Sequence, residues 1–378
     1  MASNFFSAHR ADLAALAAED RRRALIARAG VDFASNDYLA LAGSYALAEA
    51  LARGAALGIP AGSGGSRLLR GNHAEHEALE DYAARHYGTE SALFFPTGFA
   101  ANAALFAALP QRGDLVVHDE LIHASAHDGM RLGRAGRIDA RHNDPQSFDD
   151  LIARWRRGGG TGTPWIAVES LYSMDGDRAP LADLAAVARH RDAILIVDEA
   201  HATGVYGPAG QGLAHDLGDR DNLITLHTCG KALGCEGALV CGPAIVRDFL
   251  VNRGRPFIFS TAPSPLMAWL VRQALEIVAD QPERAARLHA LVRHSEKRLA
   301  RLGLPSSGSQ IVPVIIGDNA RAMRVAAALQ EAGFDIRGIR PPTVPQGTAR
   351  LRLAITLNVD ESDIDTMTDA LAAAMAGA

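Results

Sequence analysis

The sequence has 378 residues, of which 48% are hydrophobic and 21% charged, and its formal net charge is −5 at pH 7. These values allow a large buried core, and the mild acidity disfavours nucleic acid or an anionic membrane as the main partner. The three cysteines are too few for a disulfide framework. We find no secretion signal and no apolar stretch of about 18 residues, so we expect no membrane span and a location in the cytoplasm.

Up to about residue 265, short apolar strands alternate with helical patterns. The predicted helices cover residues 9–29, 44–57, 73–87, 98–108 and 181–191. The predicted strands cover residues 92–95, 115–118, 165–168, 194–197, 223–226 and 238–241. The Gly-rich segment 58–67 between two of these helices must be an irregular loop. Continuous apolar strands between helices favour an α/β fold with a mostly parallel sheet covered on both faces.

Beyond about residue 265 the pattern changes to that of a smaller α+β domain. Its predicted elements are a long helical stretch over 266–302, strands at 311–316 and 351–355, and helices at 319–332 and 361–375. We therefore predict three parts. They are an N-terminal helix and segment over 1–45, a large domain over 46–270 and a small C-terminal domain over 271–378.

Ligands of open parallel sheets bind beyond the carboxyl ends of the strands, and Asp198 ends the apolar strand ILIV. An unpaired carboxylate is costly there, so Asp198 needs a cationic partner. A pyridinium nitrogen would serve, and His201 could bind the phenolic oxygen of the same ring. One alternative is the Mg-binding DEAH box of helicase-type ATPases, but the GxxxxGK[ST] loop that it needs is absent. A strand-end Asp that caps a helix is the other alternative.

Lys231 follows the strand at 223–226 and stands between the small residues Gly230 and Ala232. A lysine in such a place at a sheet edge can be desolvated and approached closely, which makes it a nucleophile toward an aldehyde. The sequence has only one other lysine, Lys297, in a charged helical pattern where we expect it to be solvated. Lys231 is therefore the candidate to hold pyridoxal 5'-phosphate (PLP) as a Schiff base.

Two further segments suit the same cofactor. Thr97-Gly98-Phe99 lies between a strand and a helix, where backbone N–H groups can bind a phosphate, and Thr228 could add a hydroxyl. His123 could lie flat on an aromatic cofactor ring. Its i, i+4 spacing to His127 also suits zinc, but no further ligands are evident, so we predict no metal; a purely structural histidine is the third interpretation. The GSGGSR segment lacks the Rossmann pattern GxGxxG.

Together these segments resemble the α-oxoamine synthase family of fold-type-I PLP enzymes, from about residue 30 to the end. The matching segments are SNDYLAL, GSGGSR, HxxHxxLE, TGFAAN, HASAHDG, YSMDGDRAPL, VDEAHATGVYGPAGQG, GKALG, FIFSTAPSP and RPPTVPQGTARLRLAIT. The last of them most resembles the biotin-pathway member. The resemblance implies a large domain with a mostly parallel seven-stranded sheet, a small C-terminal domain, and a decarboxylative condensation of L-alanine with a pimeloyl thioester. The acyl carrier, coenzyme A or an acyl carrier protein, stays open.

The resemblance also implies roles for residues of the large domain. Lys231 holds the cofactor and then removes the α-proton of alanine, Asp198 pairs with the ring nitrogen, and His123 stacks on the ring and contacts the acyl carbonyl. The other cofactor contacts that it implies are Gly98, Phe99, Ser173, His201 and Thr228.

Four residues outside that set are implied as substrate contacts. Arg352 is suited to clamp the alanine carboxylate with two parallel hydrogen bonds. The others are Arg21, Asn36 and Thr343. A sister synthase that uses glycine, or an aminotransferase of the same fold, is the alternative function.

Family members are homodimers whose site lies at the subunit interface. By this resemblance, Ser260 or Thr261 in FIFSTAPSP is expected to reach the phosphate of the neighbouring subunit. The sequence departs from the family around the lysine, where Cys229, Cys235 and Glu236 stand in place of other residues.

Overall fold

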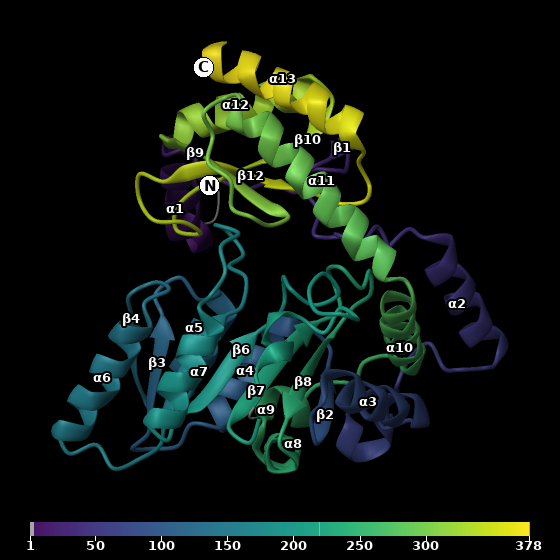
Figure 1. Ribbon diagram of the computed structural model, residues 1–378, viewed down its shortest axis with the longest axis vertical. Helices are drawn as coiled ribbons and strands as arrows, with labels where there is room; N and C mark the ends of the chain where they lie inside the picture. Colours follow the sequence, from purple (N-terminus) through teal and green to yellow (C-terminus); the bar gives the residue numbers. More distant parts are fainter. Residues whose placement is uncertain (1–3, 219, 378) are drawn as a thin grey trace. The chain divides into compact units, whose positions relative to one another are not determined.

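The structure is a computed structural model that describes residues 4–218 and 220–377. Their contacts group them into two units (Figure 1). The large unit comprises Leu39–Ser173 and Asp177–Ala286. The small unit takes in the chain up to Tyr38, the short segment Met174–Gly176, and the chain from Arg287 onward. None of the described helices combines the length and apolar character needed to cross a membrane.

A seven-stranded sheet forms the centre of the large unit, with the strand order β2-β8-β7-β6-β5-β3-β4. Its strands are β2 (Ser91–Phe95), β3 (Leu115–Asp119), β4 (Gly136–Ala140), β5 (Pro164–Glu169), β6 (Ile194–Asp198), β7 (Leu223–Thr228) and β8 (Ala238–Gly242). Only β8 runs antiparallel to its neighbours β2 and β7, while the pairs from β7 to β4 are parallel. The predicted mostly parallel seven-stranded sheet is therefore confirmed.

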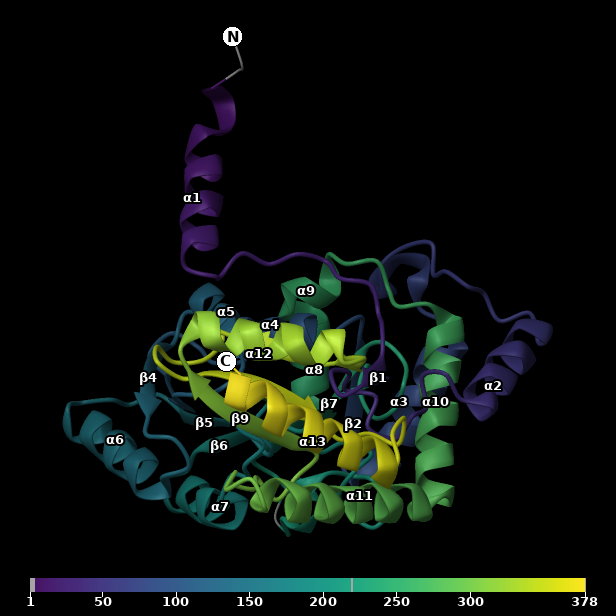
Figure 2. The ribbon, with the colours of Figure 1, turned by 90° about the horizontal axis from the view of Figure 1, so that it is seen from above.

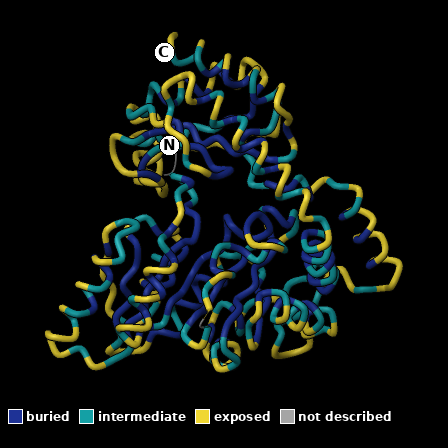
Figure 3. The backbone as a smooth tube through the Cα atoms, in the orientation of Figure 1, coloured by how far each residue is buried: buried dark blue, intermediate teal, exposed yellow. Residues whose placement is uncertain are grey.

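Both faces of this sheet are covered, as the continuous apolar strands predict. Alternate side chains point to opposite faces, so Val116 of β3 belongs to one apolar cluster and Val117 to the other. The first cluster includes residues of α4 (Gly98–Ala108), α5 (Ala124–Leu132), α8 (Ala244–Arg253) and α9 (Arg255–Ile258). The second includes residues of α6 (Pro145–Arg157) and α7 (Leu181–His190). In Figure 3 most strands of this sheet are accordingly dark blue, and β4, which has four exposed residues, is the exception.

The large unit has three further helices, α2 (Tyr45–Ala56), α3 (Ala74–Tyr87) and α10 (Pro265–Asp280), and α10 packs against both α2 and α3. Gly54 permits the close approach of α2 and α10, because a Cβ at this position would lie 2.7 Å from the Trp269 ring. The short elements η2 (Arg67–Gly71) and η3 (Leu213–Asp216) complete the unit.

The small unit contains a three-stranded antiparallel sheet in which β12 (Ala349–Ala354) lies between β11 (Arg337–Ile339) and β9 (Ile311–Gly317). A two-residue parallel pair joins β1 (Val31–Asp32) to β10 (Phe334–Asp335). The helices are α1 (Ser7–Ala18), α12 (Asn319–Glu331), α13 (Glu361–Gly377) and most of α11 (Pro282–Ala300), after the short η1 (Asn4–Phe6). Figure 2 shows α12 and α13 side by side and α1 projecting from the rest of its unit.

Two of the predicted helices are wrong in extent. The helix predicted over 9–29 ends at Ala18, because Asp20 adopts a left-handed φ of 54°. The long helix predicted over 266–302 is two helices, since Pro282 has no N–H to continue α10 and instead begins α11. The compact units also begin and end elsewhere than the predicted parts, because the β1–β10 pair joins residues 31–32 to the C-terminal elements.

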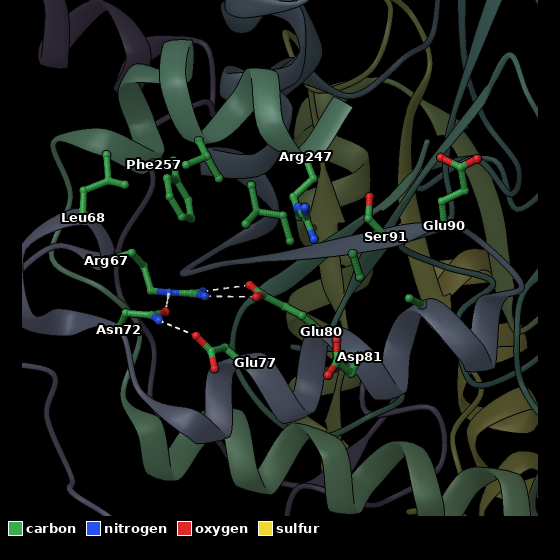
Figure 4. A pocket seen from close by; sticks show the side chains of 14 residues that line it. Arg67, Leu68, Asn72, Glu77, Glu80, Asp81, Glu90, Ser91, Arg247 and Phe257 are labelled. Carbon is green, nitrogen blue, oxygen red and sulfur yellow. Dashed lines mark hydrogen bonds and ion pairs between the residues drawn. The ribbon is translucent and has the colours of Figure 1, made fainter. Parts of the chain in front are cut away.

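A buried ion pair ties η2 to α3 beside a cavity of about 480 Å³ (Figure 4). The Arg67 guanidinium donates two hydrogen bonds to Glu80, at 2.8 and 3.0 Å, and the two side chains are only 8% and 12% exposed. Glu80 also accepts the backbone N–H of Phe94 at the end of β2. This one carboxylate therefore satisfies donors from two separate elements.

Glu80→Leu should destabilise the protein by about 3–5 kcal/mol, because it leaves a buried guanidinium without its counter-charge. Urea unfolding followed by circular dichroism measures the loss. Asp81→Leu is the matched control: Asp81 lies on the same helix but is exposed, and its loss should stay within about 0.5 kcal/mol. Equal losses for the two variants would contradict the role given to the ion pair.

Candidate active site

Three carboxylates lie at the carboxyl ends of neighbouring strands of the large unit. Asp119 ends β3, Glu169 ends β5 and Asp198 ends β6, and all three are buried. Glu169 and Asp198 are direct neighbours in the parallel pairing of β5 with β6. Buried carboxylates at this edge need partners, and each of the three obtains them differently.

Asp198 accepts hydrogen bonds from two N–H donors. The Asn102 side chain donates to one carboxylate oxygen at 2.8 Å, and the backbone N–H of Ala200 donates to the other at 2.9 Å. Asn102 lies in the middle of α4, on the face of that helix that packs on the sheet, and is 3% exposed. The sequence reasoning missed Asn102; the signal was a lone amide inside a helix of otherwise apolar residues.

Glu169 has one oxygen without a partner in the part of the chain that the structure describes. Its Oε2 accepts the backbone N–H of Ser173 at 3.1 Å, whereas its buried Oε1 has no hydrogen bond. Burial raises the pKa of Glu169 well above its usual range, the charge of Asp198 raises it further, and Lys231 opposes the shift. One buried carboxylate oxygen at the strand ends, Glu169 Oε1, thus has no hydrogen bond from the described residues.

His123 lies close to both Asp198 and Lys231. The residue as a whole is exposed. Its Nδ1 atom is held by a hydrogen bond, at 2.7 Å from the Ser125 hydroxyl. Burial of the ring lowers the pKa of His123, the charge of Asp198 opposes this, and the charge of Lys231 adds to it. His127, the other half of the i, i+4 pair, packs against His118 instead.

Lys231 lies in the connection between the antiparallel strands β7 and β8. Backbone hydrogen bonds close this loop at both ends, from Cys229 to Gly237 and from Gly234 to the Lys231 carbonyl, each at 2.9 Å. The Cys229 thiol is fully buried, and burial raises its pKa well above the usual range, so it acts as a packing group. Glu236 is exposed.

The start of α4 is the place where the sequence predicts an anion site. The Thr97 hydroxyl accepts the N–H of Ala100 at 3.0 Å and so caps the helix. A Cβ on Gly98 would lie 2.7 Å from the Thr228 methyl, so glycine is required for β7 and α4 to meet here. Phe99 is 52% exposed, and His201, in the turn after β6, is buried. The structure therefore brings Gly98 and Thr228 together, as predicted.

His142 joins two of the loops at this sheet edge. Its two ring nitrogens contact Asp119 at 2.9 Å and Asp177 at 2.7 Å, and the edge of Tyr172 packs on the ring. Asn143 donates to the same two carboxylates. Burial alone would lower the pKa of His142, but the hydrogen bonds and charges of the two aspartates raise it to about 10.

Two predicted substrate residues meet in the small unit. Nη2 of Arg352, on β12, donates to the Asn36 side chain at 2.9 Å and to the Tyr38 hydroxyl at 3.3 Å, and Arg352 is 7% exposed. Arg350, two residues earlier on the same strand, instead forms an ion pair with Asp175. The two arginines of ARLRL thus have different partners, one a carboxylate and the other two neutral oxygens.

The other two predicted substrate residues do not contact each other. Arg21 donates to the carbonyl of Pro341 at 3.1 Å and pairs with Glu19 at 2.8 Å. The arginine that reaches Thr343 is Arg23, whose guanidinium donates to the Thr343 hydroxyl at 3.0 Å. The run Arg21-Arg22-Arg23 gives no periodic signal that would distinguish its members.

Residues 28–371 match the model of the aminotransferase class I and II family. The chain belongs to this family. An 8-amino-7-oxononanoate synthase from Anaeromyxobacter dehalogenans is 44% identical over 92% of this chain and 87% of its own length. The solved 8-amino-7-oxononanoate synthase from Francisella tularensis has a TM-score of 0.77 at 26% identity, over 91% of this chain and 97% of that one. A serine palmitoyltransferase from S. paucimobilis, with bound PLP–myriocin aldimine, has a TM-score of 0.90 at 26% identity over 98% of each chain.

These matches confirm the predicted fold type, the kinship with the 8-amino-7-oxononanoate synthases and the cofactor, PLP. The residues present fit this aminotransferase-family cofactor. The unpartnered Glu169 Oε1 and the Asp198 carboxylate mark a place for further polar atoms. The start of α4 beside Thr228 suits a phosphate.

The His142 contacts predict a pH dependence of stability. A group whose pKa is raised from 6.5 to about 10 on folding stabilises the fold fully below pH 6.5, and this contribution is lost as the pH rises to about 10. His142→Asn lacks that contribution. The wild-type urea midpoint should therefore exceed that of His142→Asn at pH 6.5, and the difference should shrink toward pH 10. A difference that stays constant over this range would show that His142 carries no charge.

Proposed function

We propose that the protein catalyses the PLP-dependent condensation of L-alanine with a pimeloyl thioester, with loss of carbon dioxide, to give 8-amino-7-oxononanoate in biotin biosynthesis. The observation that carries the proposal is the joint presence of the Lys231–Asp198–His123 cluster in the large unit and of 44% identity to an 8-amino-7-oxononanoate synthase. The alternative, a sister synthase that uses glycine, rests on the same cluster.

The bound cofactor supplies an electron sink for the electrons released at the α-carbon. Asp198 would hold the pyridine nitrogen protonated, and Thr228 with the backbone at Gly98 and Phe99 would hold the phosphate. Ser173 and His201 would bind the phenolic side of the ring. Lys231 would hold the cofactor covalently and, once released by the amino acid, take the α-proton on its amine.

Arg352 would bind the alanine carboxylate and so fix rotation about the bond between nitrogen and the α-carbon. Two neutral hydrogen-bond acceptors, Asn36 and Tyr38, already hold its Nη2, so the guanidinium is oriented before substrate arrives. His123 would receive the acyl carbonyl. Thr343 and Arg21 remain predictions as substrate contacts.

Assembly as a homodimer with a shared site, and a location in the cytoplasm, also belong to the proposal. Support for the dimer comes from exposed apolar side chains on two adjoining segments, Leu69 and Phe259, which are 85% and 70% exposed. The segments are joined by a hydrogen bond from Ala262 to Gly65 at 2.8 Å. Ser260 and Thr261, the residues proposed to reach the neighbour's phosphate, lie in the second of them.

The proposed reaction predicts release of carbon dioxide from L-alanine and a pimeloyl thioester by the purified protein. Borohydride reduction should fix the cofactor on Lys231, as located by peptide mass spectrometry. Lys231→Ala should abolish turnover, and Lys297→Ala, the matched control, should leave it unchanged. Equal rates with glycine and an acetyl thioester would reject the alanine assignment in favour of the sister synthase.

Arg352→Lys should raise the KM for alanine and lower kcat together. A lysine cannot supply two parallel hydrogen bonds, so the carboxylate that does bind is misoriented for loss of the α-proton. Hydrogen–deuterium exchange at the α-carbon of alanine, followed by NMR, isolates the proton-transfer step from acyl transfer. Exchange that is unaffected by Arg352→Lys would remove the carboxylate role from this residue.

A further inference from the structure

Asn102 and Ser125 form a continuous hydrogen-bonded path from Asp198 to His123. The Asn102 amide nitrogen lies 2.8 Å from Asp198 Oδ2 and 2.9 Å from the Ser125 hydroxyl, and that hydroxyl lies 2.7 Å from His123 Nδ1. Asn102 and Ser125 are 3% and 1% exposed. The path links two residues of the cluster through two side chains to which the proposed chemistry gives no role.

Counting donors and acceptors along this path fixes every proton in it. The backbone N–H of Ser125 can only donate, and it points at His123 Nδ1 at 3.3 Å, so this nitrogen is an acceptor. The two hydrogens on the Asn102 amide nitrogen go to Asp198 and to the Ser125 oxygen. The Ser125 hydrogen then has one acceptor left on the path, His123 Nδ1.

Two donors facing Nδ1 leave the ring only one place for its proton, which is Nε2. Protonation of Nδ1 would set an N–H against two donors, so the neutral ring is favoured. The charges near the ring, Asp198 and Lys231, are of opposite sign and act in opposite directions on it. Burial of the ring also lowers the pKa of His123, in agreement with this count.

We propose that Asn102 and Ser125 are positioning residues that hold His123 as the neutral Nε2–H tautomer and fix the plane of the Asp198 carboxylate. The inference rests on the proposed function for its meaning in catalysis. His123 then presents an N–H donor to a carbonyl oxygen and is not a general acid at neutral pH. The amide of Asn102 thus orients both Asp198, the proposed partner of the cofactor's ring nitrogen, and His123, the residue proposed to stack on the cofactor.

The tautomer can be measured without turnover. Nitrogen-15 NMR of the holoenzyme, labelled at histidine, distinguishes a protonated from an unprotonated ring nitrogen, and loss of the signal in His123→Gln assigns it. At pH 7 we expect Nε2 to carry the proton and Nδ1 to be unprotonated. A protonated Nδ1 in the wild-type enzyme would overturn the proposal, whatever the variants do.

Ser125→Ala removes one of the two donors to Nδ1, and Ser125→Thr keeps it. In Ser125→Ala the backbone N–H of residue 125 still faces Nδ1, so the proton should stay on Nε2. His123 should nevertheless titrate at higher pH than in the wild type, because one of the two donors that oppose protonation of Nδ1 is lost. We expect kcat to fall about tenfold, as for loss of an outer hydrogen-bond partner at metal sites, with the KM for alanine unchanged. Ser125→Thr should restore the wild-type NMR signature. Wild-type signals in Ser125→Ala would overturn the role of the hydroxyl.

Asn102→Ala provides an independent variant if Ser125→Ala does not fold, because it should free the Ser125 hydroxyl and broaden the His123 signals. His123 signals identical to wild type would overturn the role of Asn102. Failure of the proposed function is distinguishable from failure of this inference. If the protein releases no carbon dioxide from alanine but His123 has the expected tautomer, only the proposed function is rejected. If the protein turns over but His123 Nδ1 is protonated, only the role of the Asn102–Ser125 path is rejected.

Discussion

A carboxylate at the buried end of β6 sets the requirements that the surrounding residues meet. Asp198 ends a strand whose other residues are almost entirely apolar, at an edge where two more carboxylates end neighbouring strands. Leaving such a group unpaired is costly, so donors must be brought to it from other elements. The amide of Asn102 in α4 and the N–H of Ala200 are those donors. The position of α4 on this face is therefore coupled to the polar cluster as well as to the apolar core.

The neighbouring carboxylates show how differently the same sheet edge treats one functional group. Asp119 is surrounded by hydrogen bonds from His142, Asn143 and the backbone, and these outweigh burial and lower its pKa. Glu169 has a single backbone donor, which is too little to offset burial. Burial therefore raises the pKa of Glu169, and the charge of Asp198 beside it raises this pKa further. Glu169 thus keeps a buried oxygen without a hydrogen bond among the described residues, while the hydrogen bonds to Asp119 hold the segment that contains His142 and Asn143.

How far the sequence predicts this molecule depends on where each signal lies. Asp198, Lys231 and Gly98 follow closely after apolar runs that predict strands. Their position at the strand ends is therefore enough to single them out as candidate site residues. Strand β4 was missed because four of its five residues are exposed, and it has no apolar run. Asn102 was missed because helix periodicity gives no reason to single out one amide. The helix over 9–29 was predicted from helix propensity alone. Among its described residues α1 has none that is buried, so no packing against the rest of the unit extends it beyond Ala18.

Two histidines at this edge show why charge state requires the structure. His142 has a carboxylate oxygen at each ring nitrogen, two acceptors that both need a hydrogen, so the ring must be doubly protonated. His123 has two donors at one nitrogen, so the same side chain is held neutral. The partners lie from 2 to 35 residues away along the chain. Each hydrogen bond fixes which partner is the donor, so the fold sets the charge of each imidazole. The charged His142 joins two carboxylates, and the neutral His123 presents a single N–H.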